Sequence, residues 1–343
     1  MTAERRWRPV LWLALWLPVF GGLFWTGGSS ALGQTSLESL PAQIRQTLVS
    51  KLEGARLVDA MLTNENGHQI YELEVRQKGL LRNVTIGADG DLLARQVFLD
   101  ELPAAVRTTL KRETVGKSVS EIYWINEEGA PAYYTEFPDK QQKRALNIAP
   151  DGWLNSRQMF WTETPVEVQN GIRDKMVGIM IQSIDLAEDN DGKTYEVLER
   201  NHGREHLWIF EPTGELVAEP VSQKSVPPAA LQVLTKKADG GRQVRILKFK
   251  HADKMLYEMT WVRGEERYTC AVDADGQVVS DEMPLSALPE VVRKTVAEKT
   301  NGRYLVRIEK QPPGDGGGYE VTTRQQGKTE TLLFPPDGRL PKE

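Results

Sequence analysis

The sequence predicts an α+β protein made of five tandem α-β-β-β-β units, each a four-stranded antiparallel sheet backed by one helix. Two observations predict this fold class. Three columns of residues recur every 62 positions, and within each copy a helical hydrophobic period is followed by strand-like alternation. The columns are a proline, a tyrosine and a turn pair: Pro41, Pro103, Pro165, Pro227 and Pro289; Tyr71, Tyr133, Tyr195, Tyr257 and Tyr319; Asp89-Gly90, Asp151-Gly152, Thr213-Gly214, Asp275-Gly276 and Asp337-Gly338.

The repeat also defines the expected domain organisation. The copies fill the 343-residue chain from residue 34 onward, which leaves no room for a separate catalytic domain. Because a unit of 62 residues has a small core, we expect neighbouring copies to stack or to share strands. The predicted segments are a signal peptide at 1–33 and repeats at 34–97, 98–159, 160–221, 222–283 and 284–343.

The first 33 residues have the three parts of a secretory signal peptide. Three arginines form a basic start, Val10–Trp25 is apolar, and Gly27–Gly33 is small and polar. We expect cleavage near Gly33 and a periplasmic or secreted mature chain. A retained anchor is the alternative, but the apolar run contains Pro18 and is shorter than the roughly 20 residues needed to span a bilayer. We therefore expect no stable membrane span after cleavage.

Each unit is expected to open with a helix. In the first copy Pro41 stands at the first helical turn, where its missing amide proton costs nothing and its fixed φ suits a helix. Ile44 and Leu48 follow at the i, i+4 spacing that places two side chains on one face. Val106 and Leu110 repeat this pair in the second copy. The spacing predicts a helix of about three to four turns.

Four strands are expected after each helix. In the first copy they cover residues 56–63, 69–77, 81–88 and 92–99, with hairpin turns rich in Asn, Asp and Gly between them. Alternation places Tyr71, Leu73 and Val75 on the face that the helix covers. We expect the opposite face to meet solvent or a partner. It carries an acidic column made of Glu72, Glu196, Glu258 and Glu320.

Composition and residue columns restrict the class of function. The chain has 43 Lys+Arg against 48 Asp+Glu, a formal net charge of −5, which does not suit the neutralisation of phosphates, so we expect no nucleic acid as a partner. The single cysteine, Cys270, lies in a column that is apolar in every other copy and is predicted to be a core thiol. His202 and His206 surround a hairpin turn and share no helical face. We expect no enzyme, no metal site and no cofactor.

Aromatic side chains in the second copy are the candidate binding residues. Tyr134 replaces the acidic residue of its column, Trp153 follows the Asp-Gly turn where other copies are polar, and Trp124 occupies a column of Leu and Lys. Exposed aromatic residues are typical anchors of protein interfaces. We predict that Tyr134, Trp153 and Trp124 bind a protein partner. The alternative is that they pack neighbouring repeats against each other.

The order of these motifs resembles the PepSY-like repeat family, which is related in shape to the beta-lactamase-inhibitor-protein fold. The resemblance covers residues 36 to 340 and is carried best by Leu102-Pro103-Ala104-Ala105-Val106 and by Gly318-Tyr319-Glu320-Val321 with Asp337-Gly338. It implies an exported, non-enzymatic module that binds a protein partner, with a peptidase as the candidate that it inhibits. The alternative function is a structural or envelope scaffold without a discrete ligand site.

Overall fold

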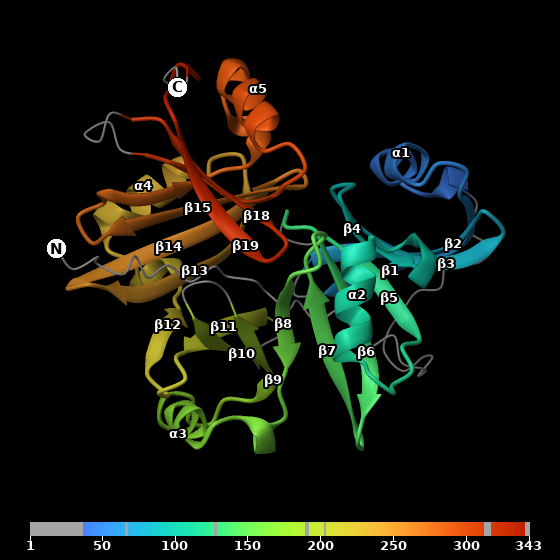
Figure 1. The fold of residues 1–343 in the computed structure, drawn as a ribbon, viewed down its shortest axis with the longest axis horizontal. Helices are drawn as coiled ribbons and strands as arrows, with labels where there is room; N and C mark the ends of the chain where they lie inside the picture. Colours follow the sequence, from blue (N-terminus) through green and yellow to red (C-terminus); the bar gives the residue numbers. More distant parts are fainter. Residues whose placement is uncertain are drawn as a thin grey trace.

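The computed structural model describes residues 37–65, 68–126, 129–188, 192–201, 204–311 and 317–339. The predicted signal peptide and His202 lie outside these ranges. Within them, no helix has the length and apolar character needed to cross a membrane. The fold is α+β, as the sequence predicts: five helices alternate with antiparallel strands, and the strands join into one 19-stranded sheet (Figure 1). We name the five copies unit 1 to unit 5.

Every unit begins with a short 3-10 helix, which is followed by a ten-residue α-helix. The repeated proline is the N-cap residue, one position before the helix and not inside its first turn as predicted. Its φ of −51° to −54° is combined with an extended ψ, and the Pro41 carbonyl accepts the first helical hydrogen bond from the Arg45 amide. The helices are α1 (Ala42–Lys51), α2 (Ala104–Glu113), α3 (Val166–Lys175), α4 (Pro228–Lys237) and α5 (Glu290–Lys299); the 3-10 helices are η1 (Leu37–Ser39), η2 (Leu99–Glu101), η3 (Trp161–Glu163), η4 (Gln223–Ser225) and η5 (Leu285–Ala287).

The strands follow the predicted order, and unit 5 contributes three of them within the described residues. Each strand pairs with the next one in the sequence. Unit 1 holds β1 (Arg56–Glu65), β2 (His68–Gln77), β3 (Leu80–Gly87) and β4 (Leu92–Val97); unit 2 holds β5 (Glu121–Ile125), β6 (Ala132–Asp139), β7 (Gln142–Ile148) and β8 (Leu154–Gln158); unit 3 holds β9 (Ile181–Glu188), β10 (Lys193–Asn201), β11 (Arg204–Phe210) and β12 (Leu216–Pro220); unit 4 holds β13 (Arg242–His251), β14 (Lys254–Arg263), β15 (Glu266–Asp273) and β16 (Val278–Glu282); unit 5 holds β17 (Tyr304–Lys310), β18 (Tyr319–Gln325) and β19 (Lys328–Phe334).

Neighbouring units share one sheet because the last strand of a unit pairs with the first strand of the next: β4 with β5, β8 with β9, β12 with β13 and β16 with β17. Equivalent ion pairs reinforce two of these junctions. Both terminal nitrogens of Arg82 donate to Glu101 at 2.7 Å, and Arg144 donates to Glu163 at 3.0 and 2.8 Å. The hydrogen bonds from Arg82 lower the pKa of Glu101 to about 2.

Each unit has its own hydrophobic core between its helix and its part of the sheet. In unit 4, Ala230 and Leu234 of α4 pack against Met259, Cys270 and Val272. The tyrosine column packs in or against the five cores, so the predicted core face of the strands is confirmed. The helices lie around the outside of the molecule (Figure 1).

The sheet winds into a coil in which units three apart in the sequence touch. Glu265, in the β14–β15 turn of unit 4, forms an ion pair with Lys51 of unit 1 at 3.0 Å. Arg324, near the end of β18 in unit 5, forms one with Asp151 of unit 2 at 2.6 Å. In Figure 1 the β18–β19 hairpin accordingly reaches down to unit 2. The coil therefore has about three units per turn, as in a solenoid with a short period.

Because the coil closes on itself, the sheet face opposite the helices turns inward. The prediction that this face meets solvent is wrong for much of its area. Thr260 and Ser156 on this face are buried, as is Glu196 of the acidic column, whereas Glu258 is half-buried. Two apolar clusters also lie here: Ala94, Tyr123, Ile125, Ala132, Tyr134 and Ala145, and Leu207, Ile209, Ala218, Leu247, Phe249, Leu256 and Ala271.

The position of Cys270 leads to a simple chemical prediction. Its side chain is buried in the core of unit 4, and this burial raises the pKa of the thiol to about 12. Because the thiolate is the reactive form, we expect no labelling of the native protein by a thiol reagent at pH 8 and one label per chain after denaturation. Mass spectrometry counts the labels. Rapid labelling in native buffer would show that the unit 4 core opens readily.

Candidate functional site

The turn that carries Trp153 is fixed by the helix of its own unit. The Thr109 hydroxyl of α2 donates to the Gly152 carbonyl at 2.5 Å, and the Thr295 hydroxyl of α5 makes the same bond to Gly338 at 3.1 Å. Gly152 has a φ of +87°, and a Cβ atom there would lie 2.7 Å from the Ala105 backbone. Only glycine tolerates both the positive φ and the close approach to α2, so the turn that carries Trp153 is held in a defined position.

Trp153, in unit 2, contacts residues of units 3 and 5. Its indole N–H donates to the Glu188 carbonyl of unit 3 at 3.1 Å. The guanidinium of Arg324, from unit 5, lies 4.8 Å from the centroid of the indole ring. This distance is within the range of a cation–π contact. The side chain of Trp153 is half-buried by these contacts.

Tyr134 is not an exposed anchor. Its side chain is 3% exposed, lies in the inner apolar cluster that includes Tyr123, and donates its hydroxyl to Glu136 at 2.8 Å. The expectation of an exposed Tyr134 is therefore wrong, because the coil covers the face on which it stands. A partner cannot reach this side chain in the folded protein.

Trp124 lies between the cores of units 1 and 2 and packs against both. The guanidinium of Arg95 is 5.4 Å from its ring centroid. All three predicted aromatic residues thus take part in packing between units, which was the alternative interpretation. They do not form one surface, and partner binding by Trp153 and Trp124 stays a prediction.

The contact between Arg324 and Asp151 holds unit 5 against unit 2. The two nitrogens Nε and Nη2 of Arg324 donate to the carboxylate at 2.6 and 3.0 Å. The side chain of Arg324 is 4% exposed and that of Asp151 is 15% exposed. The ring centroid of Tyr304, on β17, lies 5.3 Å from the same guanidinium. Burial raises the pKa of Tyr304 to about 12, so it stays protonated at neutral pH.

A cleft of about 250 Å³ opens beside Tyr304, at the junction of units 4 and 5. At this junction β16 and β17 share the single Cα pair Glu282 and Glu309, whereas the other junctions share three or four. On the side of Glu282 that faces the cleft, the Met283 amide donates to the Ile308 carbonyl at 3.0 Å, as equivalent residues do at the two preceding junctions. The cleft is lined by Gly129, Ala130, Pro131, Glu258, Arg267, Thr269, Glu282, Met283, Pro284, Leu285, Tyr304, Leu305, Val306, Arg307 and Ile308.

The walls of this cleft come from three units. The β5–β6 loop of unit 2 presses on β15 so closely that a Cβ atom on Gly129, whose φ is +72°, would lie 2.3 Å from the Arg267 amide nitrogen. The Arg307 guanidinium from unit 5 lies 3.7 Å from Glu282 and 3.8 Å from Glu320. The lining is therefore of mixed charge with apolar stretches. Its volume is below the roughly 300–1,000 Å³ of most small-molecule sites.

Metal ligation has no support in the part of the chain that the structure describes, where no group of three His, Cys, Asp or Glu side chains could hold an ion. His206 is on β11, with its Nδ1 atom 3.6 Å from Glu199.

The cleft between units 4 and 5 was missed by the sequence analysis. Its residues belong to units 2, 4 and 5, and no spacing within one unit signals their meeting.

The fold defines the chain as a tandem α+β repeat protein coiled into a single sheet. Neither a protein-family model nor a curated protein matches it. Among solved structures it has a distant match to a Bacteroides eggerthii protein provisionally described as periplasmic, with 18% identity, a TM-score of 0.25 and coverage of 34% of this chain and 85% of that one. A DUF2874 family protein from Bacteroides uniformis matches with 20% identity, a TM-score of 0.26 and coverage of 33% and 85%.

Proposed function

We propose that this protein is an exported, non-catalytic repeat protein that binds a protein partner through the cleft between units 4 and 5. One observation carries the proposal: at this junction residues of units 2, 4 and 5 together line a cleft of about 250 Å³. The cleft has the size for one or two side chains of a partner, and its lining offers both charges and apolar contacts.

The sequence resemblance favours a peptidase as the partner. In that case the mechanism is occlusion: a segment of the peptidase is held in the cleft while the rigid coil covers the surface beside it. No chemistry on the partner is required of this chain. Arg267, Arg307, Glu258 and Glu282 line the cleft, and a charged group of the partner would compete with contacts such as that of Arg307 with Glu282.

The test uses two valine positions in the β-bulge that recurs on the first strand of a unit. Val306 lines the cleft, whereas Val244, in the same bulge of unit 4, does not, and both are half-buried. We expect Val306→Asp to weaken partner binding at least tenfold, about 1.4 kcal/mol or more, because an ionised side chain in the cleft wall has to be desolvated when the partner packs against it. Val244→Asp should bind as the wild type does.

The measurement is affinity capture from the native envelope and secreted fractions with tagged wild type, Val306→Asp and Val244→Asp as baits, followed by mass spectrometry and by titration of the captured protein. Thermal unfolding checks that both variants are folded. Equal capture by Val306→Asp and the wild type would exclude the cleft as the binding site. A captured peptidase is then assayed with and without the repeat protein.

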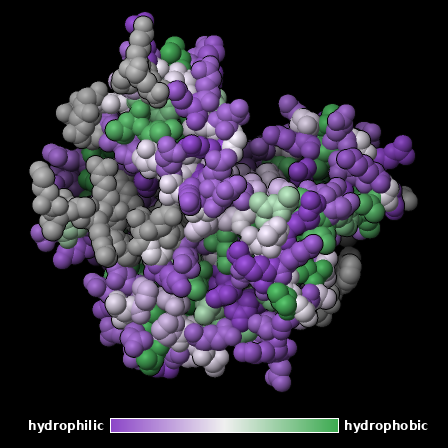
Figure 2. Space-filling view, in the orientation of Figure 1, coloured by the Kyte–Doolittle hydropathy of each residue, from purple (hydrophilic) through white to green (hydrophobic). Residues whose placement is uncertain are grey.

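An envelope scaffold without a ligand site is the second candidate. The observation that favours it is the use of Trp124, Tyr134 and Trp153 in packing between units, which leaves none of the predicted aromatic anchors fully exposed. Figure 2 adds that apolar side chains on the visible face are scattered in small groups within a mainly hydrophilic surface. If none of the three baits captures a protein, the scaffold becomes the better interpretation.

A further inference from the structure

The coil closes through one docking arrangement that occurs twice. The hairpin between the second and third strands of a unit, which we call the tip, reaches the Asp-Gly turn of the unit three places earlier. In unit 4 the tip residue Glu265 accepts a hydrogen bond from the Leu92 amide at 3.4 Å, and in unit 5 Arg324 pairs with Asp151. The two contacts use neighbouring columns and not the same one, but each joins a tip to the start of the fourth strand or the turn before it, three units earlier.

Equivalent positions in the five units show what this docking buries. In the tip column, Val262 and Arg324 of units 4 and 5 are 3% and 4% exposed. The same column is exposed in units 1 to 3, where it holds Arg76, Pro138 and Arg200. The turn column shows the reverse order: it is half-buried at Asp91 and Trp153 in units 1 and 2 and exposed at Glu215, Gln277 and Arg339 in units 3 to 5.

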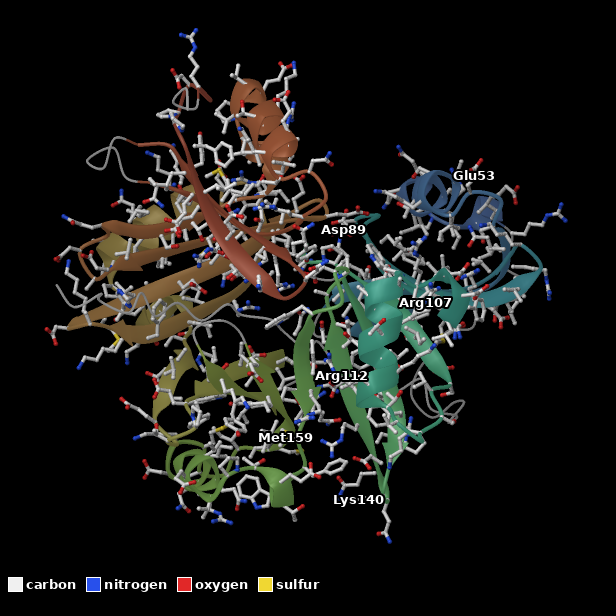
Figure 3. The ribbon with its side chains drawn as sticks, in the orientation of Figure 1. Glu53, Asp89, Arg107, Arg112, Lys140 and Met159 are labelled. Atoms are coloured by element: carbon white, nitrogen blue, oxygen red, sulfur yellow. The ribbon has the colours of Figure 1, made fainter. Side chains whose placement is uncertain are left out.

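The two ends of the coil therefore carry surfaces that are exposed here but are covered at equivalent positions in other units. We call these two surfaces rims. The tip rim consists of the tips of units 1 to 3, and the turn rim consists of the Asp-Gly turns of units 3 to 5. Figure 3 shows Lys140 at the free end of its hairpin, on the side away from units 4 and 5. Because all units share one repeat, each rim has the shape that the other rim accepts within the chain.

Two of the three tip–turn pairs carry opposite charges, whereas the third sets Arg200 of the unit 3 tip against Arg339 of the unit 5 turn. Exposed Lys78 and Lys140 lie on the tips of units 1 and 2. Exposed Glu215 and Asp275 lie on the turns of units 3 and 4, where a continued coil would place those tips. The apolar surface agrees with this: Leu333 on β19 is 68% exposed, although its column is buried in the other four units, at Thr85, Asn147, Ile209 and Ala271.

We propose that a second copy of this chain docks head to tail, with its unit 1 and unit 2 tips on the unit 3 and unit 4 turns of the first copy. Lys78 then meets Glu215, and Lys140 meets Asp275. The two surfaces differ, so the contact is heterologous and leaves a free rim at each end, and further copies extend the coil into a rod. The inference uses no residue of the cleft and does not depend on the proposed function.

The experiment is sedimentation velocity of the purified protein over a hundredfold range of concentration, at low and at high salt. We expect the weight-average sedimentation coefficient to rise with concentration, without reaching a plateau at the dimer, and to rise less at high salt because exposed ion pairs are screened. The tip variant Lys78→Glu with Lys140→Glu and the turn variant Glu215→Lys with Asp275→Lys should each stay monomeric over the range in which the wild type associates.

Mixing the two variants supplies the decisive comparison, because reversed tips match reversed turns and unchanged tips match unchanged turns. The mixture should associate again as the wild type does. Lys111→Glu with Lys236→Glu is the matched control, since it has the same charge change on exposed residues of the outer helices and should not alter association. A wild type that is monomeric throughout, a discrete dimer that grows no further, or a mixture that stays monomeric would each overturn the proposal.

Discussion

Replacing Arg324 with methionine is expected to lower the free energy of unfolding by about 3 kcal/mol. Arg324 is almost fully buried and donates twice to Asp151, so its removal leaves a largely buried carboxylate without its charge partner. The substitution also removes the cation–π contacts with Trp153 and Tyr304. The value is placed at the lower end of the range for buried pairs because Asp151 retains some contact with water.

Urea unfolding followed by circular dichroism measures this effect, and the repeat provides a control at an equivalent position. Arg76 occupies the same column in unit 1 but is exposed, so Arg76→Met should change stability by less than about 0.5 kcal/mol. Adding Asp151→Asn to Arg324→Met should recover part of the loss, because the stranded charge is then absent. If Arg324→Met unfolds at the wild-type urea concentration, the contact between units 2 and 5 does not stabilise the coil.

Replacing Asp185 with asparagine is expected to stabilise the protein above pH 7 by up to roughly 4 kcal/mol. Asp185 is buried on the inner face, and this burial raises its pKa to about 7, although the Ser183 hydroxyl donates to it at 2.7 Å. The residues opposite it are Gln158 on β8 and the buried Glu196 on β10, neither of which supplies a positive charge. Asparagine can accept the same bond from Ser183 without being ionised.

The raised pKa fixes the sign of the pH dependence. Between the unfolded pKa near 4 and the folded pKa near 7, Asp185 binds more protons in the folded state than in the unfolded state. The free energy of unfolding of the wild type therefore falls as the pH rises through this window. Asp185→Asn should remove that part of the slope, so that the two proteins differ most above pH 7 and least near pH 4.

Urea unfolding at a series of pH values measures the difference. Asp273→Asn is the control with the opposite sign, because hydrogen bonds from the Gln277 and Asp275 amides and from Lys254 lower the pKa of Asp273. Its stabilising contribution is present above the unfolded pKa and is lost as the pH falls, so Asp273→Asn should destabilise at neutral pH. A difference between wild type and Asp185→Asn that does not grow with pH would contradict the burial of an ionisable Asp185.

The candidate site was predictable only in part. The aromatic substitutions at Trp124, Tyr134 and Trp153 were visible as departures from their columns, and the structure places all three in contacts between units. The cleft was not visible, because it depends on the junction of units 4 and 5 and on a loop of unit 2 that meets this junction in space. The meeting of three units is not a property of one local segment.

The sequence by itself determined the unit: its helix, the order of its strands and the face that carries the tyrosine column. Local periodicity decides these features, because an i, i+4 pair or a strict alternation puts apolar side chains on one side of the chain whatever surrounds it. Only the tertiary structure decided that the opposite face is buried and that the units coil with three per turn. Those outcomes depend on contacts such as the ion pair of Arg324 with Asp151, which are 173 residues apart. Both residues are polar, and they become buried only when the coil closes over them.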